Sequence, residues 1–177
     1  MCLSCQLLAP HFDTARSLFQ YTGPAASLVK KFKFGGHYYL GQKILQDAAE
    51  KEWLPFHLAK CDTAVPVPLH SQRIRQRGFN QAALLAEYLA NRHDLEFQRR
   101  ALKREKATEQ QARLSIPARK KNVKGAFSVQ TNLLSGKNVL LVDDVMTTGA
   151  TADECARMIK KADAESTHVF TLVRANV

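Results

Sequence analysis

Short apolar runs alternate along the chain with stretches whose apolar residues recur at helical spacing. Residues 139–142 are continuously apolar and branched, which is typical of a strand buried on both faces of a parallel sheet. Residues 168–173 predict another strand, and residues 63–68 predict a short one that its two prolines must end. Helical spacing is found in residues 80–92 and again from Ala152 onward. This order predicts an α/β fold with a doubly wound, mainly parallel sheet.

The remaining segments give weaker signals of secondary structure. Two helices are predicted at residues 25–34 and 38–53, and the basic segment at residues 73–79 is predicted to be a loop. Residues 1–20 are too few to form a core of their own. We therefore expect a small N-terminal appendage over residues 1–20 and one domain over residues 21–177.

Composition narrows the class of protein. With 177 residues, 45% of them apolar, the chain can bury one proper core. No apolar run approaches the roughly 20 residues of a membrane-spanning helix, and the N-terminus lacks an apolar stretch preceded by positive charge. The four cysteines make a poor disulfide framework, which fits a reducing compartment. We expect a cytoplasmic protein that does not bind membranes.

The net charge is +10, and the excess is concentrated in residues 99–124. This segment holds ten lysines and arginines against two acidic residues, Glu105 and Glu109. One interpretation is a solvated mobile loop. The other is a surface for anions, either the phosphates of a substrate or a nucleic acid.

Residues 139–151 read VLLVDDVMTTGAT, and this motif carries the candidate chemistry. A buried strand ends in Asp143 and Asp144, and a turn of small hydroxyl residues then opens a helix. The free amides and the dipole of a helix N-terminus favour an anion, so this turn can wrap a phosphate monoester. The two carboxylates can accept hydrogen bonds from the hydroxyls of an attached sugar. The candidate ligand-binding residues of the turn are Val145, Met146, Thr147, Thr148, Gly149, Ala150 and Thr151.

This motif resembles the signature of the type I phosphoribosyltransferases. It lacks the Gly-Lys-Ser/Thr ending of a nucleoside-triphosphate loop and the glycine triplet of a dinucleotide fold. The resemblance implies that the acidic pair binds the ribose 2- and 3-hydroxyls and that the turn holds the 5-phosphate of phosphoribosyl pyrophosphate. It also implies Mg²⁺, held by the pyrophosphate and the ribose hydroxyls. The structural alternative is a buried strand followed by surface acids and capping threonines.

Further motifs resemble the ComF family over about residues 21–174. They are, in order, residues 65–70 (VPVPLH), 77–81 (RGFNQ), 111–115, Arg119 with 122–123, and 126–127. ComF proteins are similar to phosphoribosyltransferases and are associated with natural competence, in which incoming single-stranded DNA is processed in the cytoplasm. The related GntX group is linked to sugar-acid utilisation. The resemblance therefore implies a role in DNA uptake and transformation.

Two basic regions are predicted to support the ligand site. In the loop after Pro68 we expect Leu69, His70, Arg73 and Arg77 to contact the pyrophosphate, because ligands of such folds lie beyond the carboxyl ends of the strands. Residues 102–124 occupy the position of the loop that closes over the substrate in similar enzymes. There Arg104 is a candidate catalytic residue, and Gln111 and Arg113 are candidate ligand contacts. The same charges could instead follow a nucleic-acid backbone.

The cysteines raise the question of zinc. Relatives of this kind commonly begin with two Cys-x-x-Cys pairs, whereas here only Cys2 and Cys5 are present. A structural zinc site takes four ligands, so this half site would need His11, an upstream segment or a second chain. The alternative is two ordinary thiols. Cys61 and Cys155 are predicted to be small core residues.

Three functions remain open. The first is a Mg²⁺-dependent phosphoribosyltransferase of nucleotide or small-metabolite metabolism. The second is a non-enzymatic, ligand-sensing module that binds single-stranded DNA, and both roles can coexist in one competence factor. The third is a partner subunit whose cysteine pair docks a DNA-processing protein.

Overall fold

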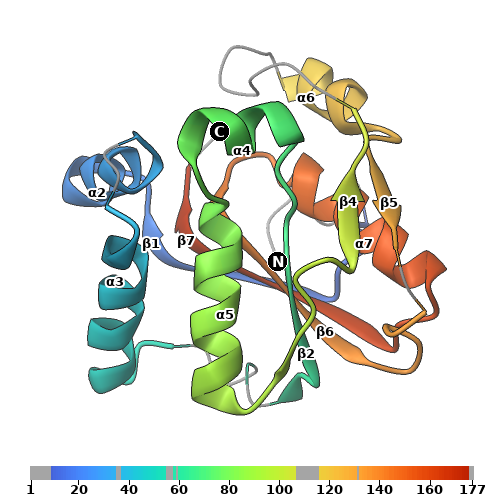
Figure 1. Cartoon of the computed structure of the whole chain (residues 1–177), viewed down its shortest axis with the longest axis horizontal. Helices are drawn as coiled ribbons and strands as arrows, with labels where there is room; N and C mark the ends of the chain where they lie inside the picture. The colour runs from blue at the N-terminus through green and yellow to red at the C-terminus, as the bar shows by residue number, and fades with distance from the viewer. Residues whose placement is uncertain are drawn as a thin grey trace.

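A five-stranded parallel sheet forms the centre of the molecule (Figure 1). The computed structural model describes residues 9–34, 37–54, 58, 60–106, 116–130 and 132–175. Within these residues the strand order is β1-β7-β6-β2-β3, and each neighbouring pair is parallel. The predicted mainly parallel α/β fold is therefore confirmed. The strands are β1 (Thr14–Gln20), β2 (Thr63–Pro66), β3 (Glu96–Phe97), β6 (Asn138–Met146) and β7 (Ser166–Arg174).

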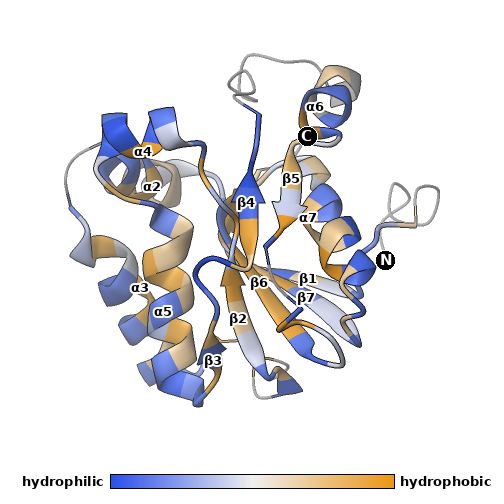
Figure 2. Ribbon diagram, turned by 45° about the vertical axis from the view of Figure 1, so that its right-hand side comes forward, coloured by the Kyte–Doolittle hydropathy of each residue, from blue (hydrophilic) through white to orange (hydrophobic). Residues whose placement is uncertain are grey.

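Helices cover both faces of this sheet. Successive residues of a strand point to opposite faces, and in β6 both sets of residues are apolar, so each face needs a cover. Leu140 and Val142 of β6 belong to one apolar cluster, while Val139 and Leu141 belong to the other. The first cluster packs beneath α2 (Gly23–Phe34), α3 (Tyr39–Glu50) and α5 (Gln81–His93). The second packs beneath α7 (Ala150–Lys161). Figure 2 shows the hydrophobic strands between these two layers.

A separate two-stranded ribbon lies beside α7 (Figure 1). It pairs β4 (Leu102–Arg104) with β5 (Phe127–Val129) in antiparallel fashion. Between these strands the chain forms α6 (Ile116–Val123). The region expected to be the loop that closes over the substrate, residues 102–124, is thus, where described, a strand at one end and a helix at the other.

The N-terminal boundary predicted from the sequence is wrong. Residues 14–20 are not an appendage: they form β1, an edge strand paired with β7. Side chains join the pair as well, because Ser17 and Thr171 share a hydroxyl hydrogen bond of 2.7 Å and Asp13 Oδ2 accepts from the Thr167 amide at 2.8 Å. The domain therefore includes residues that precede Tyr21.

The predicted basic loop after β2 is also corrected. It is the short helix α4 (Ser71–Arg77), which His70 caps by accepting from the Gln72 amide and which Gly78 ends at φ 82°. The next helix, α5, begins as predicted, because the Asn80 side chain accepts from the Ala82 amide at 3.1 Å. At 13 residues α5 is the longest described helix, and no helix of the described chain is long and apolar enough to cross a membrane.

Candidate functional site

The turn between β6 and α7 is built to let an anion approach the backbone. Gly149 precedes the first residue of α7 at φ 80°, a left-handed conformation that glycine adopts without strain. A Cβ at this position would meet Met146 Cε at 2.9 Å. The Thr148 hydroxyl accepts from the Ala150 amide at 3.4 Å and so shapes the entry to the helix. The positive end of the α7 dipole faces this turn.

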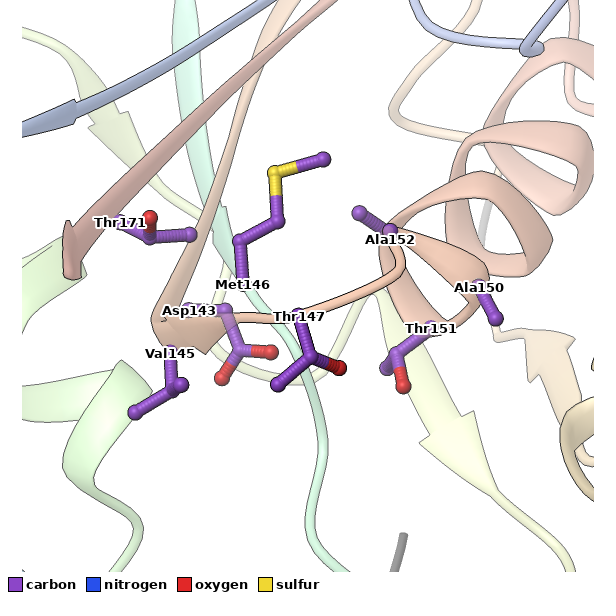
Figure 3. Close-up of a pocket in the computed structure, with 9 residues that line it drawn as sticks. Asp143, Val145, Met146, Thr147, Ala150, Thr151, Ala152 and Thr171 are labelled. Carbon is purple, nitrogen blue, oxygen red and sulfur yellow. The ribbon is translucent and has the colours of Figure 1, made fainter. Parts of the chain in front are cut away.

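A small, open hollow lies at this turn. In Figure 3 the Asp143 carboxylate and the Thr147 and Thr151 hydroxyls lie on the same side of the turn, while Met146 points to the other side. Sugar hydroxyls and a phosphate could therefore be held together there. The hollow is lined by Asp143, Val145, Met146, Thr147, Gly149, Ala150, Thr151, Ala152 and Thr171.

Most of the predicted residues of the acidic pair and the turn therefore line one hollow, but Thr148 and Asp144 do not. Thr148 shapes the turn instead, and Asp144 turns away to contact α2. Thr171 was not predicted from the sequence. It reaches the site because β7 is paired with β6 in a register that places Thr171 opposite Asp143.

The two acidic residues have different surroundings. Asp143 lines the hollow, whereas Asp144 forms an ion pair with Lys33 of α2, with 3.1 Å between Lys33 Nζ and Asp144 Oδ1. The Asp144 amide donates to Asp143 Oδ1 at 2.8 Å. The adjacent acids are thus a pocket-facing carboxylate and a carboxylate held by a lysine.

Burial, and then the neighbouring Asp144 carboxylate, raise the pKa of Asp143 to about 7. The Lys33 and Arg104 cations and the hydrogen bond from the Asp144 amide act in the opposite direction. A carboxyl with this pKa changes between its acid and ionised forms near neutral pH. Perturbed groups of this kind are concentrated at functional sites.

Arg104 lies close to this acid. It is buried at 8% exposure, and its guanidinium lies 5.2 Å from the centre of the Phe127 ring. Burial and then the charge of Arg73 lower the pKa of Arg104, while the charges of Cys155 and Asp143 act in the opposite direction. The structure thus brings Arg104 of β4 into the neighbourhood of Asp143, where the sequence predicted Arg104 to act, and brings Arg73 of α4 near Arg104.

The other predicted contacts are only partly placed at the hollow. Leu69 and His70 directly follow β2, but His70 Nδ1 accepts from the Gln72 amide at 3.3 Å as a helix cap. Arg77 Nη1 donates to Gln81 Oε1 at 3.3 Å. Gln111 lies outside the described residues, as does Arg113.

The predicted zinc half site also falls outside the described residues, which do not include Cys2 and Cys5. His11, which could have completed it, has its Nδ1 2.9 Å from Asp153 Oδ1 at the start of α7. Among the described residues no group of three or more histidine, cysteine or acidic side chains gathers to hold a metal. Cys61 and Cys155 are buried core residues, as predicted.

Comparisons with known proteins agree with this architecture. Residues 74–177 match the family model described as the phosphoribosyl transferase domain. Competence protein F of Haemophilus influenzae is 33% identical over 98% of this chain and 78% of that protein. The DNA utilization protein YhgH of Salmonella typhi is 33% identical over 98% of this chain and 77% of that protein.

Among solved structures, glutamine phosphoribosylpyrophosphate amidotransferase from B. subtilis, complexed with ADP and GMP, aligns with 64% of this chain and 24% of that chain at 21% identity, with a TM-score of 0.44. The match of residues 74–177 and the 33% identity to Competence protein F establish family membership. The chain belongs to the phosphoribosyl transferase domain family and, within it, to the ComF family.

Proposed function

We propose that the hollow at the end of β6 binds phosphoribosyl pyrophosphate and that the chain acts in natural competence as a phosphoribosyltransferase-type protein. The observation that carries the proposal is the arrangement of Asp143, Thr147 and Thr151 around one hollow at the start of α7. A carboxylate for sugar hydroxyls and a helix N-terminus for a phosphate line the same hollow. The family membership and the names of the two relatives support the same proposal.

In this proposal the turn holds the 5-phosphate. The amides at the start of α7 and the hydroxyls of Thr147 and Thr151 surround the phosphate oxygens. Gly149 adopts its left-handed φ of 80° without strain, so the backbone of the turn can take the conformation that approaches the phosphate. Asp143 in its ionised form accepts hydrogen bonds from the ribose hydroxyls.

The pyrophosphate extends toward the arginines. Arg73 and Arg104 are close enough for their charges to interact. Arg104 also interacts electrostatically with Asp143. Forked guanidinium donors suit phosphate oxygens.

Mg²⁺ would be carried largely by the ligand. The described residues offer no all-protein metal cage, and Mg²⁺ is usually bound through substrate phosphates with one or two carboxylates. Asp143 is the carboxylate of the hollow, so the donor set fits an ion that is shared with the substrate. When bound, Mg²⁺ would neutralise the charge of the leaving pyrophosphate.

If the site is catalytic, an acceptor nucleophile displaces pyrophosphate at the anomeric carbon of the ribose. The bond from that carbon to the pyrophosphate oxygen breaks as the bond to the acceptor forms. Asp143 would stabilise the positive charge that develops on the ribose, and the arginines would stabilise the departing anion. An assay for pyrophosphate release in the presence of candidate bases distinguishes an active enzyme from a ligand sensor.

A thermal-shift titration with phosphoribosyl pyrophosphate and Mg²⁺ tests binding directly. Ligand at about 100 times its Kd would stabilise the folded chain by about 2.7 kcal/mol, which corresponds to roughly 5–10 °C for a chain of this size. Asp143→Asn should lose this gain. The matched control is Asp47→Asn, which removes an exposed carboxylate on α3 that pairs with Lys43 at 2.9 Å. A wild-type chain that shows no shift at any ligand concentration would refute the proposal.

A second function, binding of single-stranded DNA in the cytoplasm, is favoured by a separate observation. The basic helices α2, α4 and α6 lie at the same end of the molecule in both views (Figures 1 and 2). Near α4, Tyr38 and Tyr39 are 55% and 65% exposed, and the Tyr38 ring stacks edge-on against Phe79 at 4.8 Å. Positive charge for phosphates and exposed rings for base stacking are what a single strand requires.

Salt dependence tests this second function. DNA affinity should fall linearly with salt on logarithmic axes, because each neutralised phosphate releases counterions. A protein that binds DNA and ligand without releasing pyrophosphate would be the sensing module. A protein that binds neither would instead be a partner subunit for DNA-processing proteins.

A further inference from the structure

Glu154 is a buried carboxylate in the helix that begins at the phosphate turn. It lies one helical turn after Ala150, the first residue of α7, and it is 8% exposed. Arg157 binds both of its oxygens: Arg157 Nε donates to Oε2 at 2.9 Å, and Nη2 donates to Oε1 at 2.6 Å. Such a bidentate pair fixes the orientation of the carboxylate.

The same carboxylate also holds the base of the two-stranded ribbon, which lies beside α7 in Figure 1. Glu154 Oε1 accepts from the Gly125 amide at 2.7 Å. Gly125 lies between α6 and β5 and has φ 64°. Immediately after it, the Ala126 carbonyl accepts from the Glu105 amide at 2.9 Å, where β4 ends. Glu154 therefore attaches α7 to the place where both strands of the ribbon meet.

A short path leads from Gly125 to Arg104. Phe127, two residues further on, is paired with Arg104 across the ribbon, and the Arg104 guanidinium lies 5.2 Å from the centre of its ring. Phe127 is buried and belongs to the same apolar cluster as Cys155 of α7. Arg104 also interacts electrostatically with Asp143 at the hollow. The position of the ribbon on α7 therefore determines where the Arg104 guanidinium lies relative to the phosphate turn.

We propose that Glu154 is a positioning residue for the pyrophosphate end of the ligand: by holding Gly125 it fixes the ribbon on α7 and so places Arg104 to contact the pyrophosphate. This inference rests on the proposed binding of phosphoribosyl pyrophosphate. Apolar packing is non-directional and does not by itself select one position of the ribbon, whereas a charge-assisted hydrogen bond does. Because α7 also begins at the phosphate turn, one rigid helix then sets the distance between the two ends of the ligand site.

A purely structural role for Glu154 predicts a different outcome. If Glu154 only stabilised the fold, its removal would affect every ligand of the hollow alike. If it places Arg104, its removal must weaken the binding of phosphoribosyl pyrophosphate and leave that of ribose 5-phosphate nearly unchanged. Ribose 5-phosphate presents the same sugar hydroxyls and 5-phosphate but has no pyrophosphate for Arg104 to contact.

The test measures the Kd of both compounds, each with Mg²⁺, by calorimetry on variants of the full chain. Glu154→Met removes the acceptor for the Gly125 amide, whereas Glu154→Gln keeps an oxygen that can accept from it. Arg157→Met leaves Glu154 in place but removes the two hydrogen bonds that orient it, and Arg157 is exposed enough (28%) for this change to leave the chain folded. The matched control is Glu105→Met, at a carboxylate of the same region that is 42% exposed.

We expect Glu154→Met to weaken the binding of phosphoribosyl pyrophosphate by about tenfold, the usual effect of losing one hydrogen bond to a charged group. The Kd of ribose 5-phosphate should stay within about twofold, since additive effects of distant sites agree to a few tenths of a kcal/mol. Arg157→Met should show the same selective loss, Glu154→Gln should restore most of the affinity, and Glu105→Met should match the wild type.

A double variant shows whether Glu154 acts through Arg104. Adding Glu154→Met to Arg104→Met should weaken the binding of phosphoribosyl pyrophosphate no further than Arg104→Met alone. Additive losses, or equal losses for the two compounds in Glu154→Met or Arg157→Met, would overturn the inference and leave the proposed function intact. If the wild type binds neither compound, the proposed function fails and the positioning role fails with it.

Discussion

Asp143 of β6 and Thr171 of β7 lie opposite each other on paired strands, so the pocket carboxylate has a buried hydroxyl residue as its neighbour. The Thr171 hydroxyl lies 2.7 Å from Ser17 Oγ on β1 and donates to the Val173 carbonyl at 3.2 Å. The Thr171 side chain therefore joins β7 to β1 beside the pocket carboxylate.

Thr171→Val should destabilise the fold by about 1 kcal/mol, because it removes these hydrogen bonds and keeps the shape of the side chain. Urea unfolding of the single variants and of the double variant with Ser17→Ala measures the coupling. If the two changes were simply additive, the hydroxyl bond between β1 and β7 would contribute nothing.

Gly149→Ala should abolish ligand stabilisation and lower stability by about 1–2 kcal/mol, the usual cost of a side chain at a left-handed position. The new Cβ would also meet Met146 Cε at 2.9 Å, so the turn that is proposed to hold the phosphate would have to shift. Gly136→Ala is the matched control, since Gly136 has φ 68° and open space around it. Both variants should lose stability in a thermal melt, and only Gly149→Ala should lose the ligand-induced shift.

The raised pKa of Asp143 makes stability depend on pH in the direction opposite to that of an acid whose pKa is lowered by folding. Because its folded pKa, about 7, lies above the ordinary value of 3.8, the folded state binds more protons than the unfolded state between these values. Stability should therefore fall as the pH rises through this window. Asp143→Asn should melt above the wild type at pH 8, and the difference should close toward pH 4.

Asp143→Asn should also lose ligand binding. At pH 8 this variant would therefore gain stability and lose function. Melting curves with and without phosphoribosyl pyrophosphate and Mg²⁺, recorded across the pH range, measure both effects. A wild type and an Asp143→Asn variant with parallel pH profiles would show that Asp143 has an ordinary pKa.

Tyr39→Ala should weaken binding of a single-stranded oligonucleotide, because base stacking on an aromatic ring contributes about 1–3 kcal/mol per base. Tyr39 is 65% exposed, so its removal should leave the melting temperature nearly unchanged. Fluorescence anisotropy with a labelled oligonucleotide measures the loss, and Leu133→Ala, at another exposed apolar residue (51%), serves as control. Equal affinity of the wild type and Tyr39→Ala would place DNA elsewhere on the surface.

The buried elements could be predicted from the sequence because their patterns are local. Strand β6 is continuously apolar, and α7 carries its apolar residues at helical spacing, so neither depends on knowing its neighbours. The edge strand β1 was missed because its sequence, TARSLFQ, is only half-buried and shows no clean alternation. The short helix α4 was missed because it has seven mostly charged or polar residues and depends on caps at His70 and Gly78.

The same distinction applies to the candidate site. The turn residues were found because they are contiguous in the sequence and each has a local physical role. Lys33 and Thr171 were not found, because they reach the acidic pair only through the order of the strands: β1 leads into α2 at one edge, and β7 lies between β1 and β6. No local pattern in the sequence predicts that Lys33 and Thr171 lie next to the acidic pair.

The parallel pairing of β1 with β7 has a practical consequence for anyone who shortens this protein. A chain that starts at Tyr21 would leave the outer backbone amides and carbonyls of β7 without their neighbour, and open strand edges of this kind promote self-association. It would also lose the His11 contact to Asp153 at the first turn of α7, next to the phosphate-binding turn. Deletions from the N-terminus should therefore stop before His11.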